Sequence, residues 1–139
     1  MNVDDTRKTL DAYLDALTGG GDFAAYFDDE VSWTTTETGE RVTGREEVRD
    51  LILALHTRMF HASPEVRNVV VGEGRAALEA VFVGVHAETF GDVPATGAKV
   101  RSLYSVFYDL EDGRITALRA YFPVTALVQE LRKAVPSPD

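Results

Sequence analysis

The stretch RAALEAVFVGVHAETFGDVPATGAKV, residues 75–100, decides the fold. Its first half alternates with a period of two and predicts a β-strand over 75–88, followed by a loop that contains Gly and Pro. One face of this strand carries Phe82, His86 and Glu88, and the other face is also mostly apolar. An antiparallel strand with one face in water alternates apolar and polar residues, so both faces of this strand must be covered.

The segments around this strand predict an antiparallel meander. Apolar residues with a period of two indicate further strands over 65–71, 99–110 and 114–122. The tripeptides GEG and EDG supply the tight turns between them. An earlier segment, VSWTTT at 31–36, is rich in β-branched and aromatic residues and predicts one more strand.

Helical spacing of apolar residues marks the other segments. Leu10 begins an apolar stripe that predicts a helix over 4–18, which ends at three consecutive glycines. Asp22 can cap a short helix in the sequence FAAYF that follows it. A final helix is predicted over 124–134.

The main helix is predicted from a capping signal and an apolar stripe. Thr43 and Glu46 have the spacing of a capping box. The stripe that follows consists of Val48, Leu51, Ile52, Leu55 and Met59. We expect this helix to end near His61, because Ser63-Pro64 cannot continue it.

This order of elements predicts one α+β domain over residues 1–135, with helices packed on one face of a curved antiparallel sheet, and a disordered tail over 136–139. The helices can cover one face of the sheet but hardly two. The apolar outer face of the long strand therefore predicts a homodimer that buries it.

The composition narrows the compartment and the partners. The chain has no cysteine, which excludes disulfides and thiolate metal sites and suits a reducing cytoplasm. The first residues are polar and acidic, and no apolar run approaches the ~20 residues of a membrane span. A formal net charge of −9 repels phosphate backbones and anionic headgroups. We expect a soluble cytoplasmic protein without a nucleic-acid or membrane partner.

Motifs for nucleotides and metals are absent from the sequence. It has no glycine-rich phosphate loop and no Gly-x-Ser-x-Gly elbow, which argues against nucleotide cofactors and serine-hydrolase chemistry. The three histidines lack metal-ligand spacing. We therefore expect neither a cofactor nor a metal.

Four stretches in order resemble the SnoaL-like branch of the nuclear transport factor 2-like superfamily: YLDALTGGGDFAAYFDDEVSW, GREEVRDLI, FGDVPATGAKV and DGRITALRAYF. The resemblance implies a cone-shaped curved antiparallel sheet, with helices packed on its concave face, that encloses a deep apolar pocket. The branch includes polyketide and ester cyclases, and its relatives include ketosteroid isomerase and limonene-epoxide hydrolase. Other members only bind a ligand or a protein, so the chemistry must be argued from the pocket residues.

The acidic residues that such relatives use are missing here. LRAYFP at 118–123 resembles the hydrolase pattern WRDYFD, with Ala120 at the position of the water-activating aspartate and Pro123 at that of the second aspartate. At the isomerase's base position on the first strand, this chain has Ser32, Trp33 and Thr34. The family's strand-end pattern H-x-G-x-F…P-x-T-G is similar to this chain at the following positions: His86, Phe90, Pro94, Thr96 and Gly97, with Glu88 in place of a glycine.

His86 and Glu88 are therefore the first candidate catalytic pair. Both share the strand face of Phe82, which we expect to be the cavity face. A carboxylate beside an imidazole favours its protonated form, and such a pair can move a proton onto or off an oxygen. The alternative is that His86 hydrogen-bonds the lip of the pocket and that Glu88 is solvated.

Tyr104 is the third candidate catalytic residue, because a tyrosine hydroxyl in an apolar pocket can donate to a carbonyl or an enolate. Further ligand-binding residues are expected from shared faces and from the resemblance: Tyr13, Trp33, Thr35, His56, Met59, Phe82, Tyr108, Leu118 and Phe122. Core packing is the alternative for Tyr13 and Trp33, and a structural role is the alternative for His56. For Tyr104 and Tyr108 the alternative is that their hydroxyls only cap backbone groups.

Two functions remain open at this point. The first is a cofactor-independent enzyme that uses acid/base chemistry on a small hydrophobic carbonyl, ester or epoxide compound, by cyclisation, isomerisation or hydrolysis. The second is a non-catalytic binding or dimerisation module that keeps the cavity. Ala120 and Pro123 favour this second function.

Overall fold

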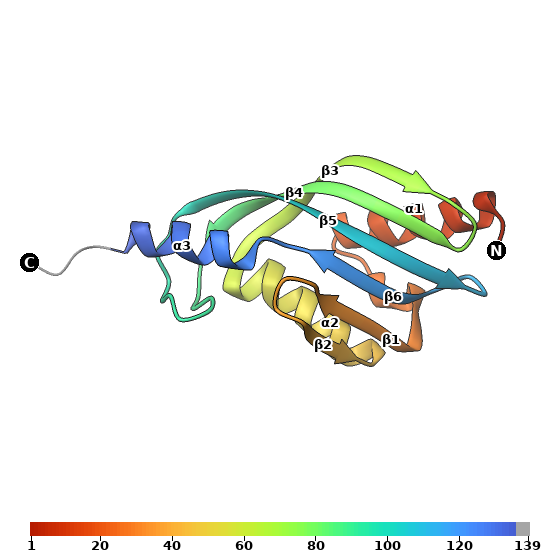
Figure 1. The fold of residues 1–139 in the computed structure, drawn as a ribbon, viewed down its shortest axis with the longest axis horizontal. Coiled ribbons are helices and arrows are strands. Elements are labelled where there is room, and N and C mark those ends of the chain that lie inside the picture. Colours follow the sequence, from red (N-terminus) through yellow and green to blue (C-terminus); the bar gives the residue numbers. More distant parts are fainter. Residues whose placement is uncertain (136–139) are drawn as a thin grey trace, which may run out of the picture.

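The computed structural model describes residues 1–135, so the predicted tail over 136–139 lies outside the described residues. The chain forms one curved sheet with helices beside it and at one end (Figure 1). In chain order the elements are α1 (Val3–Thr18), the 3₁₀ turn η1 (Phe23–Tyr26), β1 (Phe27–Thr35), β2 (Glu40–Thr43), α2 (Arg45–Leu53), the π-helical turn η2 (Ala54–Met59), β3 (Phe60–Val71), β4 (Arg75–His86), β5 (Lys99–Glu111), β6 (Arg114–Tyr121) and α3 (Val124–Ala134). None of the described helices is long and apolar enough to cross a membrane.

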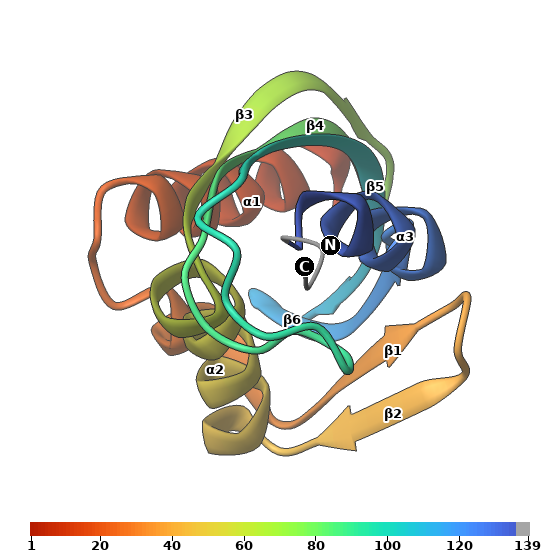
Figure 2. The same ribbon diagram turned by 90° about the vertical axis from the view of Figure 1, so that its left-hand side faces the viewer.

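The sheet has the strand order β2-β1-β6-β5-β4-β3, and its strands curve around a hollow in which α1 and α2 lie (Figure 2). The antiparallel meander of β3 to β6 is confirmed. The predicted curved sheet is present, and it is mixed rather than antiparallel throughout, because β1 pairs with β6 in parallel. This pairing joins the first and last strands of the chain. The whole is an α+β fold with a mixed, curved sheet, as the resemblance to the SnoaL-like branch implies apart from the one parallel pair.

The first strand of the meander, β3, begins earlier than its sequence indicates. β3 starts at Phe60 and contains Pro64, which lies opposite Phe82 on β4. Proline cannot donate to a strand ladder, but β3 is an edge strand and has a neighbour on one side only. Pro64 therefore marks an edge strand, and the helix before it ends at Met59.

Two predicted helix caps are absent. Gly44 is the N-cap residue of α2 and makes no side-chain bond, while Thr43 belongs to β2 and lies opposite Ser32. The capping box of Thr43 and Glu46 is therefore wrong, because the short strand β2 takes the threonine. Asp22 precedes η1 but its side chain does not cap it.

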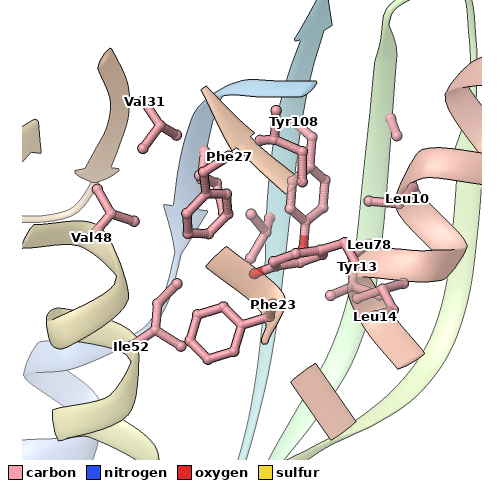
Figure 3. Close-up of a cluster of buried hydrophobic side chains, with 14 of the residues drawn as sticks. Leu10, Tyr13, Leu14, Phe23, Phe27, Val31, Val48, Ile52, Leu78 and Tyr108 are labelled. Atoms are coloured by element: carbon pink, nitrogen blue, oxygen red, sulfur yellow. The ribbon is translucent and has the colours of Figure 1, made fainter. Parts of the chain in front are cut away.

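The core near α1 is built from aromatic rings. Tyr13 of α1 packs against Phe23, Phe27 and Tyr108, with ring centroids 6.3, 5.5 and 5.9 Å away (Figure 3). Each fully buried side chain of this size stabilises the fold by roughly 1.5–3 kcal/mol. A second cluster lies toward the other end of the sheet and contains Phe60, Phe82, Phe90 and Phe122.

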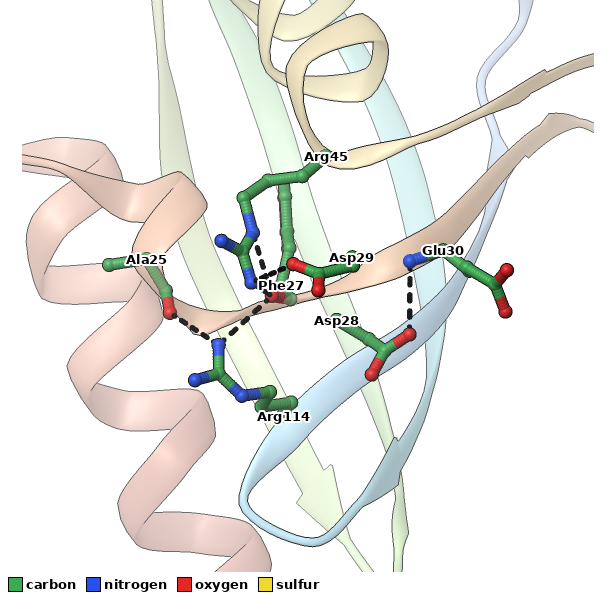
Figure 4. Close-up of polar contacts among 7 residues, drawn as sticks. All are labelled: Ala25, Phe27, Asp28, Asp29, Glu30, Arg45 and Arg114. Atoms are coloured by element: carbon green, nitrogen blue, oxygen red, sulfur yellow. Dashed lines mark hydrogen bonds and ion pairs between the residues drawn. The ribbon is translucent and has the colours of Figure 1, made fainter.

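Two arginines fix the entry of β1 relative to α2 and β6. Arg45 donates through Nε and Nη2 to the carbonyl of Phe27, at 3.1 and 2.9 Å, and pairs with Asp29 (Figure 4). Arg114 donates to the same carbonyl and to that of Ala25. The pairing of β1 with β6 shifts register just after Phe27. The two guanidinium groups donate to the carbonyl of Phe27, which lies beside this irregularity.

Candidate functional site

A small cavity lies between the inner face of the sheet and α1 and α2. Its volume is about 30 Å³, which is room for one or two water molecules. It is lined by Tyr13, Leu17, Trp33, Ile52, Leu55, His56, Leu78, Phe82, Tyr104, Val106, Tyr108, Leu118, Ala120 and Phe122. The lining carries no charged Asp, Glu, Lys or Arg side chain, and its polar groups are three phenols, an indole and an imidazole.

A wider groove adjoins this cavity. It measures about 270 Å³ and is lined by Trp33, Thr35, Thr38, Glu40, Leu51, Ile52, Leu55, Met59, Phe90, Gly91, Phe122 and Val124. Four residues belong to both linings and so lie between the two spaces: Trp33, Ile52, Leu55 and Phe122. The site therefore has a narrow inner end and a roomy outer end.

Three tyrosine hydroxyls converge on the inner cavity. Tyr13 comes from α1, whereas Tyr104 and Tyr108 come from the inward-facing positions of β5 (Figure 3 shows Tyr13 and Tyr108). Burial raises the pKa of Tyr104 to about 12. Burial and the neighbouring tyrosines raise the pKa of Tyr13 and Tyr108 further. All three phenols are therefore protonated donors at neutral pH.

His56 supplies the complementary acceptor. Its Nδ1 lies 2.8 Å from the carbonyl oxygen of Ile52, and a carbonyl only accepts, so Nδ1 carries the proton. In the neutral ring Nε2 is then a free acceptor, and it is buried with no hydrogen-bond partner among residues 1–135. Burial lowers the pKa of His56 below the model-peptide value of 6.5. The imidazole is a neutral base held against Phe82, with ring centroids 5.5 Å apart.

The π-helical turn explains how His56 reaches this position. Residues Ala54–Met59 continue α2 with a wider turn, in which N–H groups bond five residues back rather than four. From this turn the imidazole of His56 reaches back to the carbonyl of Ile52, four residues earlier. π-turns inside helices occur often at functional sites.

His86 lies away from the cavity. Its side chain is 1% exposed and its ring is 5.3 Å from that of Phe60. Nδ1 accepts from the backbone N–H of Thr96 at 3.2 Å and lies 2.8 Å from the Thr96 hydroxyl. Its Nε2 is buried without a partner among the described residues. These contacts tie loop 87–98 to the end of β4.

Glu88 is exposed and follows the end of β4, where its backbone N–H donates to the carbonyl of Met59. Neither Glu88 nor His86 lines the cavity or the groove. The structure therefore does not bring this pair to Tyr104, because the strand ends at His86 and its continuation turns outward.

Most of the other predicted ligand-binding residues lie at the site. Those at the cavity are Tyr13, Trp33, His56, Phe82, Tyr108, Leu118 and Phe122, and those at the groove include Thr35 and Met59. Ala120, at the position of the missing acid, also lines the cavity. Glu40 was not foreseen, although its place opposite Thr35 would have indicated it had β2 been recognised.

The comparisons with known proteins agree with this fold. Among proteins of curated function, none matches this chain in sequence. A candidate polyketide cyclase from Xanthomonas campestris pv. campestris is 21% identical, with a TM-score of 0.79 and 94% of this chain and 99% of that chain covered. A candidate SnoaL-like polyketide cyclase from Jannaschia sp. CCS1 is 18% identical, with a TM-score of 0.83 and coverage of 96% and 94%.

A candidate ketosteroid isomerase from Kribbella flavida DSM 17836 is 23% identical, with a TM-score of 0.68 and coverage of 87% and 79%. At these identities the similarity shows the fold alone. The SnoaL-like domain family matches residues 10–118, which is most of the chain. This protein belongs to the SnoaL-like domain family.

Proposed function

We propose that this protein is a cofactor-independent enzyme that moves a proton on a hydrophobic carbonyl compound, in an isomerisation or an intramolecular cyclisation. His56 is the base, and Tyr104, with Tyr13 and Tyr108, donates hydrogen bonds to the carbonyl oxygen. The observation that carries the proposal is the buried Nε2 of His56, an acceptor without a partner at the wall of a cavity that also holds three phenols.

The unpaired acceptor favours a ligand at this place. A buried polar atom that lacks a hydrogen bond costs about 1–3 kcal/mol. Nε2 of His56 shares this state with Nε2 of His86, but only His56 is on the lining of the cavity. A ligand carbon or oxygen that carries an acidic proton supplies the missing partner. Because Nδ1 is held by Ile52, the ring presents the same nitrogen to every ligand.

The phenols suit the charge that develops when a proton leaves. Abstraction of a proton beside a carbonyl places negative charge on the carbonyl oxygen, and donors already in position stabilise it. Burial keeps the three hydroxyls protonated, as their raised pKa values require. The uncharged lining of the inner cavity favours a neutral carbonyl end of the substrate there, since an ion would lose its hydration without a counterion.

The experiment is product analysis by mass spectrometry on lactones, polyketide-like esters, unsaturated ketones and epoxides. We expect conversion of an unsaturated ketone or a polyketide-like compound and a loss of about 10²–10⁴-fold in His56→Asn. Asparagine keeps a donor for the Ile52 carbonyl but removes the base. The exposed His61→Gln is the matched control, and His86→Gln tests the other buried histidine.

The competing function is a binding module without chemistry, and Ala120 at the cavity wall favours it. Recovery of every compound unchanged, including those that bind, would support that function. Conversion that persists in His56→Asn but disappears in His86→Gln would move the base to His86. If only epoxides or esters are converted, the reaction is a hydrolysis and not the proposed isomerisation or cyclisation.

We also propose that the protein is a homodimer through the outer face of the sheet. Apolar side chains on that face remain exposed, above all Leu103 at 73%, Tyr121 at 51% and Phe107 at 44%. Leu103 lies opposite Val81 of β4, and Phe107 packs against Tyr121 across β5 and β6. A second copy of the chain would remove these side chains from water.

A further inference from the structure

Only one of the residues that line the cavity or the groove is charged. Glu40 lines the outer groove, and no Lys or Arg side chain lines either space. The carboxylate of Glu40 takes part in none of the ion pairs formed within residues 1–135. We propose that the groove binds the ammonium group of a hydrophobic amine, with Glu40 as its counterion.

The register of the β1–β2 hairpin sets the place of this carboxylate. Trp33 lies opposite Val42, and Thr35 lies opposite Glu40. Side chains two residues apart point to the same face of a strand, so Trp33, Thr35 and Glu40 share the face that lines the groove. Glu40 is therefore about 7 Å along the strand from the level of Trp33.

The polar side of the groove is organised without Glu40. Trp33 donates from Nε1 to the hydroxyl of Thr35 at 3.0 Å, and the hydroxyl of Thr38 lies within bonding distance of the Thr35 carbonyl. The backbone N–H of Glu40 donates to the Thr38 hydroxyl at 3.2 Å, which holds the backbone, and Glu40 itself is exposed at the groove.

The facing wall is apolar. It is formed by Leu55 and Met59 of η2, Phe90 of loop 87–98, and Phe122 and Val124 where β6 leads into α3. A groove with an apolar wall and a single carboxylate is complementary to a hydrophobic body that carries one positive charge. The aromatic rings of Trp33, Phe90 and Phe122 add a favourable surface for a cation.

This inference rests on the proposed function in one respect: one substrate is assumed to extend from the inner cavity into the groove. Trp33 and Phe122 line the cavity as well as the groove, so a ligand with its carbonyl at the tyrosines has its other end beside Glu40. The substrate class then becomes a hydrophobic carbonyl compound with an amino group at the end remote from the carbonyl. A carboxylate at that end would meet Glu40 in a protein of net charge −9.

The test uses three ligands with one body: 4-phenylbutylamine, 4-phenylbutanol and 4-phenylbutanoate. Trp33 is the sole tryptophan, so its fluorescence reports binding at the site itself, and calorimetry confirms the affinities. At low ionic strength we expect the amine to bind about fivefold more tightly than the alcohol, and the carboxylate to bind most weakly. In Glu40→Gln the amine and the alcohol should bind equally.

Glu30→Gln is the matched control, because it removes the same charge from β1 at an exposed site outside the groove (Figure 4). It should keep the fivefold preference. An alcohol that binds as tightly as the amine, or a preference that survives in Glu40→Gln, would overturn the proposal. His56→Asn separates the two proposals, since it should abolish turnover while the preference for the amine remains.

Discussion

His56 and Ile52 form the hydrogen bond that fixes the tautomer of the imidazole at the cavity. The imidazole donates from Nδ1 to the Ile52 carbonyl at 2.8 Å, across one turn of the same helix. Because that bond fixes the proton on Nδ1, the basic atom of the neutral ring is Nε2. The proposed base thus comes from the π-turn after α2, while β6 contributes Ala120 to the lining of the same cavity.

The first prediction concerns the pH dependence of turnover. Burial lowers the pKa of His56, so the neutral base should persist below pH 6.5. We expect kcat/KM to be flat near neutrality and to fall at acidic pH through a value below 6.5. Because the pKa of Tyr104 is raised to about 12, no alkaline limb from this tyrosine should appear below about pH 11. An acidic limb centred above 7 would contradict the assignment of His56 as base.

The second prediction concerns folding stability. The pKa of His56 is lower in the folded protein than in the unfolded chain, where it is about 6.5, so between these values the unfolded chain binds more protons. The contribution of His56 to stability is therefore present above pH 6.5 and decreases as the pH falls below it. Urea denaturation at several pH values should show a smaller loss on acidification in His56→Asn than in the wild type. Equal losses in both would argue against a buried neutral imidazole.

The third prediction is that the two buried histidines are opposite tautomers. His56 donates from Nδ1, whereas His86 accepts at Nδ1 from the Thr96 backbone N–H and so carries its proton on Nε2. Nitrogen-15 NMR of histidine-labelled protein at neutral pH should give a protonated Nδ1 for His56 and a protonated Nε2 for His86. The same tautomer at both positions would show that one of the two hydrogen-bond assignments is wrong.

Local patterns in the sequence explain why the meander and the main helices could be predicted. A period of two over 75–88 reflects side chains that alternate between two covered layers, and β4 extends over Arg75–His86. The parallel pairing of β1 with β6 has no such local signal, because it joins segments more than eighty residues apart. The strand β2 was missed because its four residues, Glu40–Thr43, are too few to show a period.

The residues that line the site could be predicted from the sequence, His56 among them, but the role of His56 as the proposed proton acceptor could not. Parity along the strands indicated Phe82 and Leu118, since any inward position near the middle of the sheet faces the cavity. Parity also indicated His86. Strand parity carries no information about the following loop, in which Thr96 bonds to Nδ1 of His86. The position of His56 depends on a π-turn, and helical periodicity assumes 3.6 residues per turn throughout.

The fourth prediction concerns the hydroxyl of Tyr104. Tyr104→Phe removes a donor from the cavity and leaves the ring, which lies 5.6 Å from Phe122. If this hydroxyl stabilises the developing oxyanion, kcat should fall about 10²-fold with little change in KM. Tyr121→Phe, on the exposed outer face, is the control and should leave kcat unchanged. A rise in KM alone in Tyr104→Phe would limit Tyr104 to binding.

The fifth prediction concerns the outer face of the sheet. Leu103 is 73% exposed in the single chain and lies among other apolar side chains of that face. If two copies meet there, Leu103→Glu places a charge in the interface without a partner, and this costs several kcal/mol of association energy. Sedimentation velocity should show a dimer for the wild type at micromolar concentration and a monomer for Leu103→Glu.

Val3→Glu provides the matched control for this change. It adds the same charge at an exposed apolar residue in the first turn of α1, far from the outer face, and an acid there is favourable at a helix N-terminus. It should sediment as the wild type does. A wild type that remains a monomer at every concentration would remove the dimer, and the apolar side chains of β5 would then need another partner. A dimer that survives in Leu103→Glu would place the interface on a different face of the molecule.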